Sequence, residues 1–491
     1  MKKLVGLVLL FACTYATTQG LVFLPPDLAM PAGKIYIDHR TVQIQKRHGY
    51  SNIRVGSTGC GPTLVSALGS CGGSSYPGYV PGVGADGGPD TGGAFRTECA
   101  TSHEGFDDPI VKPRQSGTSH LHTFFGNTTT DAQSNAAAMH TFGNSTCDGG
   151  IANRTGYWVP AMVYHCPSGE VGCDRARDGE IVHARGNLAY YKTQTLDRAH
   201  LHLIQWPPAG LRMVGGDANN TDPARSANVG SFECQDNGTG LDTSFGNRIP
   251  STAEATALGT NRCVDIKMVV TFPECWNGTD LYLPPVVGGI NSSHMQYTSY
   301  AGNCPDGMVS FPNISVNVIF PIADLADIDY WVLASDHGPE YGNTQSGSTT
   351  TQVKLALSAS TADGHYVNGY LAISGQRRRI TAYTGSTRTA TLDSALSGAP
   401  AAGVSYLVRQ MGGITIHADW ANGWNQDPNF MGWGRTLTDQ IIHGCFFDSA
   451  RYGDPITALY SLDCHSDNIG DPALVGVPYS GSQTTTPYWL F

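Results

Sequence analysis

Charged residues are scarce in this 491-residue chain. They make up 14% of it, and the formal net charge is −11, with 29 basic and 40 acidic side chains. Proteins that follow nucleic-acid phosphates depend on clustered lysine and arginine. The composition therefore argues against a nucleic-acid partner, and neutral or cationic partners fit better.

The sequence also lacks the motifs of several common enzyme classes. It contains no GxSxG elbow, no phosphate-binding P-loop, no GxGxxG after a strand and no HExxH. Lipase-like, nucleotide-dependent and zincin mechanisms consequently have no support.

Long hydrophobic runs are missing as well. The one marked apolar run, residues 4–12, follows Lys2 and Lys3, is too short to cross a bilayer and precedes small polar residues. We interpret residues 1–20 as a signal peptide. The protein is expected to be secreted, outside the cell or at its surface, with no membrane span once the signal is removed.

Cysteine is frequent, which agrees with export. Of the 13 cysteines, all but Cys13 lie beyond the signal peptide, and none forms a CxxC pair typical of zinc ribbons. Scattered cysteines in an oxidising compartment predict a disulfide framework. The expected bridges that close turn-rich segments are Cys166–Cys173, Cys275–Cys304 and Cys445–Cys464.

Asn-x-Ser/Thr sequons are also frequent and predict a glycoprotein in a eukaryotic or viral setting. They lie at Asn127, Asn144, Asn153, Asn219, Asn237, Asn277, Asn291 and Asn313.

Glycine and proline, at 60 and 28 residues, separate short apolar segments. The alternation at residues 264–267 and 316–319 is typical of strands, and no sustained amphipathic helix occurs. We predict a mainly β fold, a disulfide-rich β-sandwich or jelly-roll-like domain with long loops. The predicted organisation is a Gly/Pro-rich leader and linker at 21–98, a main domain at 99–340 plus 412–491, and an inserted β-meander at 341–411.

The segment 341–411 differs from its surroundings because it lacks cysteine and carries DG, TG and SG turns. With Gly375, Arg378, Ile380 and Tyr383 in order, it resembles small β-modules of phage and viral tail or fibre proteins. It is expected to be autonomous. The run Arg377–Arg379 suggests a nucleic-acid or anionic-glycan site, but a solvated strand face is the preferred interpretation.

Two polar pairs point to a built site. His120 and His122 are two residues apart, as are His417 and Asp419 nearly 300 residues later. On a strand, residues i and i+2 face the same side. This is a spacing suited to metal ligands, and we expect the two pairs to converge.

A family resemblance supports these pairs. The ordered motifs DPIVKPRQSGTSHLHTFFGN, YWVPAMV, LRMVGGD, FPECWNGTDL, SSHMQYT, GNCPDGMVSFPNISVNVIF and HADWANGW resemble the secreted domain of unknown function numbered nineteen ninety-six. The resemblance covers roughly 105–335 and 412–447 and is interrupted by the inserted module. The polar positions that it implies are Asp108, His120, His122, Tyr190, His294, His417, Asp419, Asn422 and Trp424.

Three interpretations of these positions stay open. His120, His122, His294 and His417 are candidate ligands of a divalent metal, zinc or copper. Asp108, His122, His417 and Asp419 are candidate catalytic residues, since two carboxylates flanking a sugar suffice for hydrolysis. A purely structural hydrogen-bond network is the third, and Asp108 before a proline is equally suited to capping a turn.

Aromatic residues favour a sugar ligand, although at least half of these rings are expected in the core. The candidate substrate contacts are Tyr190, Tyr191, Trp420, Asn422 and Trp424. The resulting hypothesis is a secreted protein that binds or processes extracellular polysaccharide or cell-wall glycan through a His/Asp site, by hydrolytic or metal-dependent chemistry if it is an enzyme. The alternative is a non-catalytic cell-surface or viral structural protein that serves in adhesion.

Overall fold

The fold is built almost entirely from strands. The computed structural model describes residues 94–147, 150–192, 204–221, 229–236, 242–284, 291–298 and 304–427, together with Lys34–Tyr36, Thr438 and Cys464–His465. The helical elements with defined bounds are short: the α-helices α3 (Ala136–Thr141) and α4 (Thr252–Ala257) and the 3-10 segments η2 (Gly150–Ala152), η3 (Arg175–Arg177) and η5 (Leu325–Tyr330). The prediction of a mainly β, disulfide-rich sandwich is confirmed.

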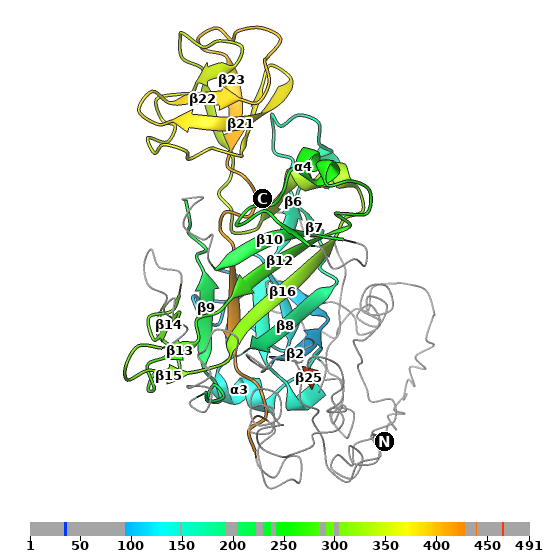
Figure 1. Cartoon of the computed structure of the whole chain (residues 1–491), viewed down its shortest axis with the longest axis vertical. Helices are drawn as coiled ribbons and strands as arrows, with labels where there is room; N and C mark the ends of the chain where they lie inside the picture. Colours follow the sequence, from blue (N-terminus) through cyan, green and yellow to red (C-terminus); the bar gives the residue numbers. More distant parts are fainter. Residues whose placement is uncertain are drawn as a thin grey trace, which may run out of the picture.

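Two large sheets form the main domain (Figure 1). The first contains, in spatial order, β1 (Lys34–Tyr36), β3 (Thr101–Gly105), β4 (His122–Gly126), β5 (Gly156–Pro160), β24 (His417–Ala421) and β9 (Arg212–Gly216). The second contains β11 (Thr243–Ser244), β10 (Gly230–Gln235), β12 (Asp265–Thr271), β16 (Asn313–Pro321), β8 (Gly186–Lys192), β2 (Ala94–Cys99) and β25 (Cys464–His465). Neighbouring strands pair antiparallel, except β2 with β25.

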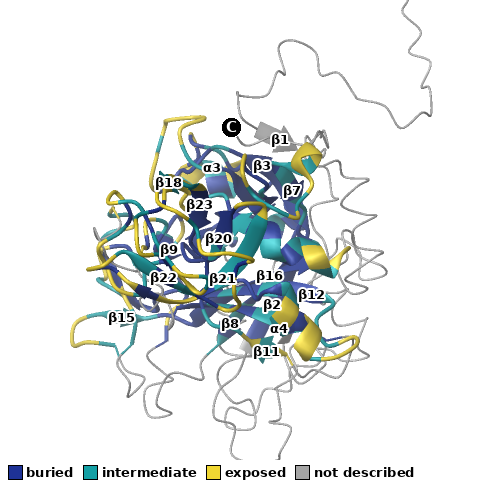
Figure 2. Cartoon of the chain, turned by 90° about the horizontal axis from the view of Figure 1, so that it is seen from above, coloured by how far each residue is buried: buried dark blue, intermediate teal, exposed yellow. Residues whose placement is uncertain are grey.

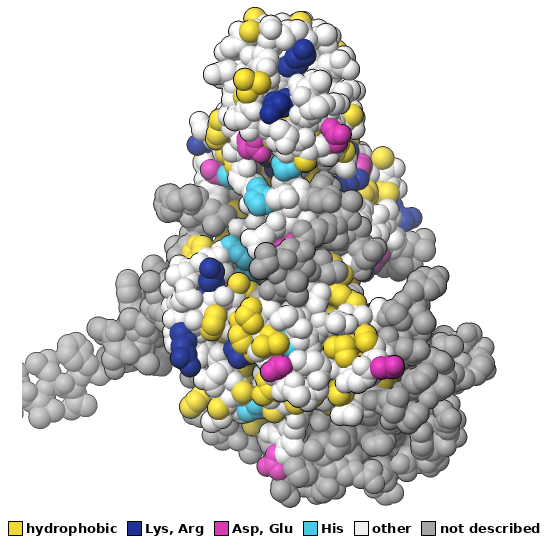
Figure 3. All heavy atoms as spheres, turned by 90° about the vertical axis from the view of Figure 1, so that its left-hand side faces the viewer, with side chains coloured by type: hydrophobic (Ala, Val, Ile, Leu, Met, Phe, Trp, Pro, Cys, Tyr) yellow, Lys and Arg dark blue, Asp and Glu magenta, His cyan; other side chains and the backbone are white. Residues whose placement is uncertain are grey.

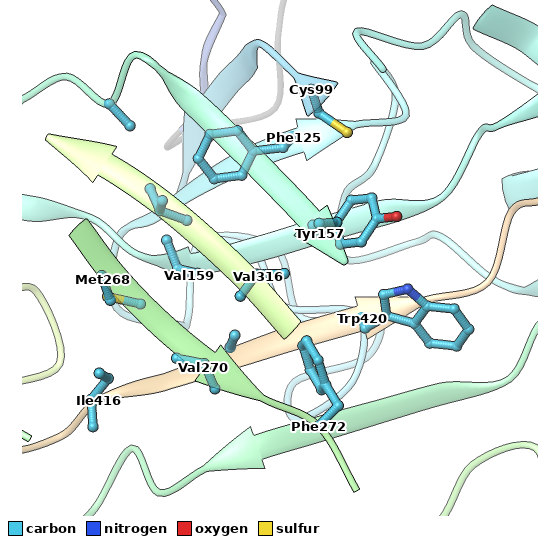
Figure 4. Close-up of a cluster of buried hydrophobic side chains, with 14 of the residues drawn as sticks. Cys99, Phe125, Tyr157, Val159, Met268, Val270, Phe272, Val316, Ile416 and Trp420 are labelled. Carbon is cyan, nitrogen blue, oxygen red and sulfur yellow. The ribbon is translucent and has the colours of Figure 1, made fainter. Parts of the chain in front are cut away.

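The hydrophobic core lies between these two sheets (Figure 4). Met268 and Val270 of β12 alternate with half-buried residues, so one face of the strand is apolar, as the sequence pattern predicts. They share one buried cluster with Val159 of β5, Trp420 of β24 and Ile416, which directly precedes β24. Buried residues accordingly fill the centre of the molecule, and exposed ones lie on its turns (Figure 2).

The opposite face of the first sheet carries the polar pairs. Trp158 of β5 lies opposite Phe124 of β4 and Asp419 of β24. Two residues further along the two outer strands of this trio are His122 and His417. Strand alternation therefore places these side chains on the face that points away from the sandwich core.

Disulfides tie the loops to the sandwich. The predicted bridges Cys166–Cys173 and Cys275–Cys304 are confirmed. Two further bridges, Cys99–Cys147 and Cys234–Cys263, join segments 48 and 29 residues apart. The predicted Cys445–Cys464 bridge lies outside the residues whose side chains are described. Two small sheets cover the sandwich ends: β14 (Met295–Gln296), β13 (Cys275–Trp276) and β15 (Val309–Ser310), and β17 (Trp331–Leu333), β6 (Met162–Tyr164) and β7 (Glu180–Val182).

The segment expected as an insertion forms a sheet of its own, seen at the top of Figure 1. Its strands in spatial order are β18 (Glu340–Asn343), β23 (Ser405–Arg409), β20 (Tyr370–Ile373), β21 (Gln376–Thr384), β22 (Thr389–Leu392) and β19 (Gln352–Lys354). A separate hydrophobic cluster that includes Val353, Leu371 and Val408 packs inside it. We retain the proposal that residues 341–411 are an inserted module.

The arginine run of this module contacts the main domain, which differs from the solvated face that we expected. Arg377 lies 2.9 Å from Asp329 and 3.4 Å from Glu170, and Arg379 lies 3.2 Å from Glu254. Arg378 points the other way and donates to a backbone carbonyl of the module itself. Alternation along β21 thus presents two of the three guanidinium groups to acidic partners.

On the face shown in Figure 3, charged side chains are sparse and hydrophobic ones form small separate groups. Within the described ranges, no helix is long and apolar enough to cross a membrane.

Replacing Arg377 with alanine should destabilise the protein more than replacing its neighbour Arg378. The Glu170 side chain is fully buried and would keep only Arg409 as a charged partner. A buried group that loses a partner costs about 1–3 kcal/mol, more if it is charged. Urea unfolding of both variants is the measurement, and equal midpoints would show that the interface pair contributes nothing.

Candidate metal centre

Three histidines from the two predicted motifs converge on one point. The Nε2 atoms of His120 and His417 lie 3.2 Å apart. The ring of His122 has its centre 4.2 Å from that of His120 and 6.0 Å from that of His417. One ring nitrogen of each lies within 4.8 Å of the others. The predicted convergence of residues 297 positions apart is confirmed.

The sheet explains this meeting. β4 and β24 flank β5, and neighbouring strands lie about 4.8 Å apart. The residue of β5 opposite His122 is Pro160. His122 and His417 reach toward each other across this position. His120 enters from the loop that precedes β4.

Backbone carbonyls fix the tautomers of two of these rings. The Nδ1 atom of His122 lies 3.0 Å from the Asp107 carbonyl oxygen, and that of His417 lies 2.8 Å from the Thr415 carbonyl oxygen. A carbonyl only accepts, so Nδ1 carries the proton in both neutral rings and Nε2 presents its lone pair. Metal-bound histidines are commonly oriented in this way.

Two carboxyl groups lie beside the imidazoles. Asp419 has one oxygen 3.9 Å from Nε2 of His417, and both of its oxygens are buried without a hydrogen-bond partner among the described residues. Asp108, His122 and Asp419 form a second group whose ligand atoms lie within 4.8 Å of one another.

Asp108 also caps a turn, as the alternative interpretation held. It accepts hydrogen bonds of 2.8 and 2.9 Å from the backbone N–H groups of Ile110 and Val111. The turn therefore holds this carboxyl group in place against Asp419. The structural role and the position at the site do not exclude each other.

Burial shifts the pKa of every titratable group in the cluster toward its neutral form. It raises the pKa of Asp108 to about 6, and burial followed by the charge of Asp108 raises the pKa of Asp419 well above its usual range. Burial lowers the pKa of His122 to about 3 and of His417 to about 4, and that of His120 well below the usual value. A cation bound here would favour ionised carboxylates and unprotonated imidazoles.

A closed loop adjoins the cluster through the Asp107 carbonyl, which bonds to His122. One carboxylate oxygen of Asp107 accepts hydrogen bonds from Ser116 and Gly117, and the Ser119 N–H donates to the Phe106 carbonyl, so the two ends of the loop meet. The loop surface is largely exposed, and His120 is half-buried while the other members are buried. The side of His120 is therefore the approach from solvent.

His294 does not join the cluster. Its Nδ1 accepts from the Leu283 N–H at 3.2 Å, and its Nε2 donates to the Arg212 carbonyl at 2.9 Å. Both ring nitrogens are occupied, which leaves none for a metal. Of the four predicted histidine ligands, the geometry supports three.

Four of the five predicted sugar contacts are fully buried. Tyr191, Trp420 and Trp424 are fully buried in the sandwich core, where the Tyr191 hydroxyl accepts from both indole N–H groups. Asn422 is also fully buried and donates to the carbonyls of two prolines. Tyr190 is half-buried on the second sheet, beside Lys192.

Several residues that support the site had no sequence signal. The carbonyls of Asp107 and Thr415 orient imidazoles through backbone atoms, which side-chain motifs do not report. Arg212 stacks on Tyr282 and donates to the Pro109 carbonyl, which braces the loop beside Asp108. Only the fold brings these segments together.

The comparison with known families agrees with the resemblance of the motifs. Residues 108–350 match the family described as "Domain of unknown function (DUF1996)". The matched segment contains Asp108, His120 and His122, whereas His417 and Asp419 lie beyond it. No curated protein and no solved structure was found to match the chain. Through residues 108–350 the chain belongs to the DUF1996 family of domains of unknown function.

Proposed function

We propose that the chain binds one divalent transition-metal ion through His120, His122 and His417, with Asp419 as a further ligand. The observation that carries the proposal is the convergence of their ligand atoms in a buried site. Two nitrogens bound to one tetrahedral zinc at about 2.0 Å lie about 3.3 Å apart. The separation of 3.2 Å between His120 and His417 fits this value.

A structural network of hydrogen bonds explains less of the geometry. An N–H of His120 donating to His417 would give the same 3.2 Å distance. It would leave Nε2 of His122 and both oxygens of Asp419 buried without partners, and such groups are costly. A metal ion satisfies all of them at once.

The ligand set favours zinc or copper over calcium or magnesium. Imidazole nitrogens suit zinc, copper, iron and nickel, whereas calcium and magnesium take oxygen ligands. His122 belongs to both candidate ligand groups, and its Nδ1 is already bonded to Asp107. Only its Nε2 is available, so the two groups describe one ion position.

The carboxyl group of Asp108, next to the proposed ion, could act as a base in a hydrolytic reaction. A bound divalent metal lowers the pKa of a coordinated water to about 7. Asp108 lies beside this position, with a carboxylate oxygen within 4.8 Å of the ligand atoms of His122 and Asp419, and a bound cation would keep its carboxyl group ionised and able to accept a proton. In this proposal Asp108 is the base, Asp419 and the histidines hold the ion, and the reaction class is hydrolysis.

We further propose extracellular polysaccharide as the partner and secretion as the location. Support comes from the leader sequence, the low charge and the four disulfides among the described residues. Because Tyr191, Trp420 and Trp424 are buried in the core, a sugar would approach from the side of His120. The inserted module favours the alternative of an adhesion or viral structural protein.

The first prediction concerns metal content. The purified chain should bind about one zinc or copper ion, measured by elemental analysis after dialysis against each metal. His122→Ala should lose the ion. His294→Ala is the matched control and should keep it, because both ring nitrogens of His294 bond to the backbone. Wild-type protein that holds no metal, or a His122→Ala variant that retains it, would contradict the proposal.

The second prediction separates stability from function at Asp419. In metal-free protein, Asp419→Asn should raise the free energy of unfolding near neutral pH by about 0.5–2 kcal/mol, because it removes a buried carboxyl group whose ionisation burial and Asp108 oppose. Added zinc should raise the melting temperature of the wild type and barely change that of the variant. If the metal-free variant melts below the metal-free wild type, the Asp419 carboxyl group stabilises the fold without metal. That result would contradict the prediction that this carboxyl group costs stability.

The third prediction distinguishes an enzyme from an adhesin. Metal-loaded protein incubated with purified cell-wall glycans should release reducing ends, measured by a reducing-sugar assay, and Asp108→Asn should lower that rate by at least about 100-fold. The release of oxidised sugars would indicate redox chemistry in place of hydrolysis. Tight binding on a glycan array without any released product would favour the adhesion alternative.

A further inference from the structure

The fold sorts seven of the eight predicted glycosylation sequons by accessibility, and the eighth, Asn237, lies outside the described residues. Four of the asparagines are buried, namely Asn127, Asn144, Asn153 and Asn313. The side-chain amide of Asn127 donates to the carbonyls of Met139 and Phe142, and that of Asn153 to a threonine hydroxyl. An N-linked sugar needs a side chain that reaches solvent, so the fold does not accommodate modification at these four positions.

Two other sequons use their side chains in turns. Asn277 is half-buried, and its amide nitrogen donates to Asp280 at 2.8 Å. Asn291 is half-buried, and its amide nitrogen donates to the carbonyls of Ser292 and Met295. A sugar on either nitrogen would have to replace hydrogen bonds that hold the local backbone.

Asn219 differs from the other described sequons because it is exposed. It lies in the turn after β9, where its backbone N–H donates to Asp217 at 2.9 Å. Next to it, Asn220 is fully buried and donates to the Ile414 carbonyl at 2.9 Å. The buried middle residue anchors the sequon, while Asn219 and Thr221 on either side are exposed.

We propose that Asn219 is an acceptor of an N-linked oligosaccharide. In this transfer the amide nitrogen of Asn219 forms a bond to the anomeric carbon of a lipid-linked oligosaccharide, the lipid diphosphate leaves, and the amide loses one proton. The proposal is independent of the metal centre. It needs only an exported chain in a cell with an oligosaccharide-transfer system, and an accessible sequon.

The position gives the modification a defined place on the molecule. The turn continues the strand that pairs with β24, and the Asp217 N–H donates to the Ile416 carbonyl just before His417. Gln410, at the end of the inserted module, donates to the Thr221 carbonyl. An oligosaccharide on Asn219 would therefore stand near the junction of the main domain and the module.

The test is site-resolved occupancy on the full chain secreted from a eukaryotic cell line. Digestion with peptide N-glycosidase in heavy-oxygen water converts each glycosylated asparagine to labelled aspartate, which peptide mass spectrometry locates. We expect label at Asn219 and none at Asn127, Asn153 or Asn277. Asn219→Gln should lose one glycan by gel mobility, whereas Asn277→Gln should leave the mobility unchanged.

A second variant guards against misfolding of Asn219→Gln. Thr221→Ala keeps the asparagine and removes the acceptor sequence, so it should also lose the glycan while the chain is still secreted. Secreted wild-type protein with an unlabelled Asn219 peptide would overturn the proposal. So would label at Asn127 or Asn153, because the folded structure buries both.

Discussion

The burial of three imidazoles beside two carboxyl groups is the constraint on which the rest of the site depends. Asp419 has both oxygens buried without hydrogen-bond partners among the described residues, and Nε2 of His122 is in the same situation. Burying such groups without partners costs free energy, whereas one divalent cation would satisfy them together. Without a bound ion, these buried polar groups lower the free energy of unfolding, and we attribute their presence to the proposed metal site. The hydrophobic core between the sheets offsets this loss of stability.

The two faces of the first sheet serve different purposes: one packs into the hydrophobic core, and the other carries the polar cluster. Tyr157, Val159 and Trp420 point into the apolar core, while Trp158, His417 and Asp419 point to the covered outer face. Because side chains alternate along a strand, the residues that hold the fold together and those that form the site are neighbours in sequence. His120 is half-buried, whereas the other members of the cluster are buried.

The inserted module is joined to this framework by buried charges. Arg377 and Arg409 both reach Glu170, and Arg377 also pairs with Asp329. Buried ion pairs contribute orientation more reliably than net stability, because desolvation of the charges opposes their attraction. These contacts therefore orient residues 341–411 against the main domain, and the segment also has an apolar cluster of its own.

The sequence by itself determined the β class, two of the disulfides and the convergence of the two His/Asp motifs. Each of these follows from local rules: strand alternation, turn residues and the spacing of cysteines. The same rules could not show that both ring nitrogens of His294 hydrogen-bond to the backbone. Nor could they show that Trp420 and Trp424 face the core, or that Arg377 forms an ion pair with Glu170. Those outcomes depend on partners far away in the chain. Only the tertiary structure decides which buried groups find such partners and which, like Asp419, are left for a ligand to satisfy.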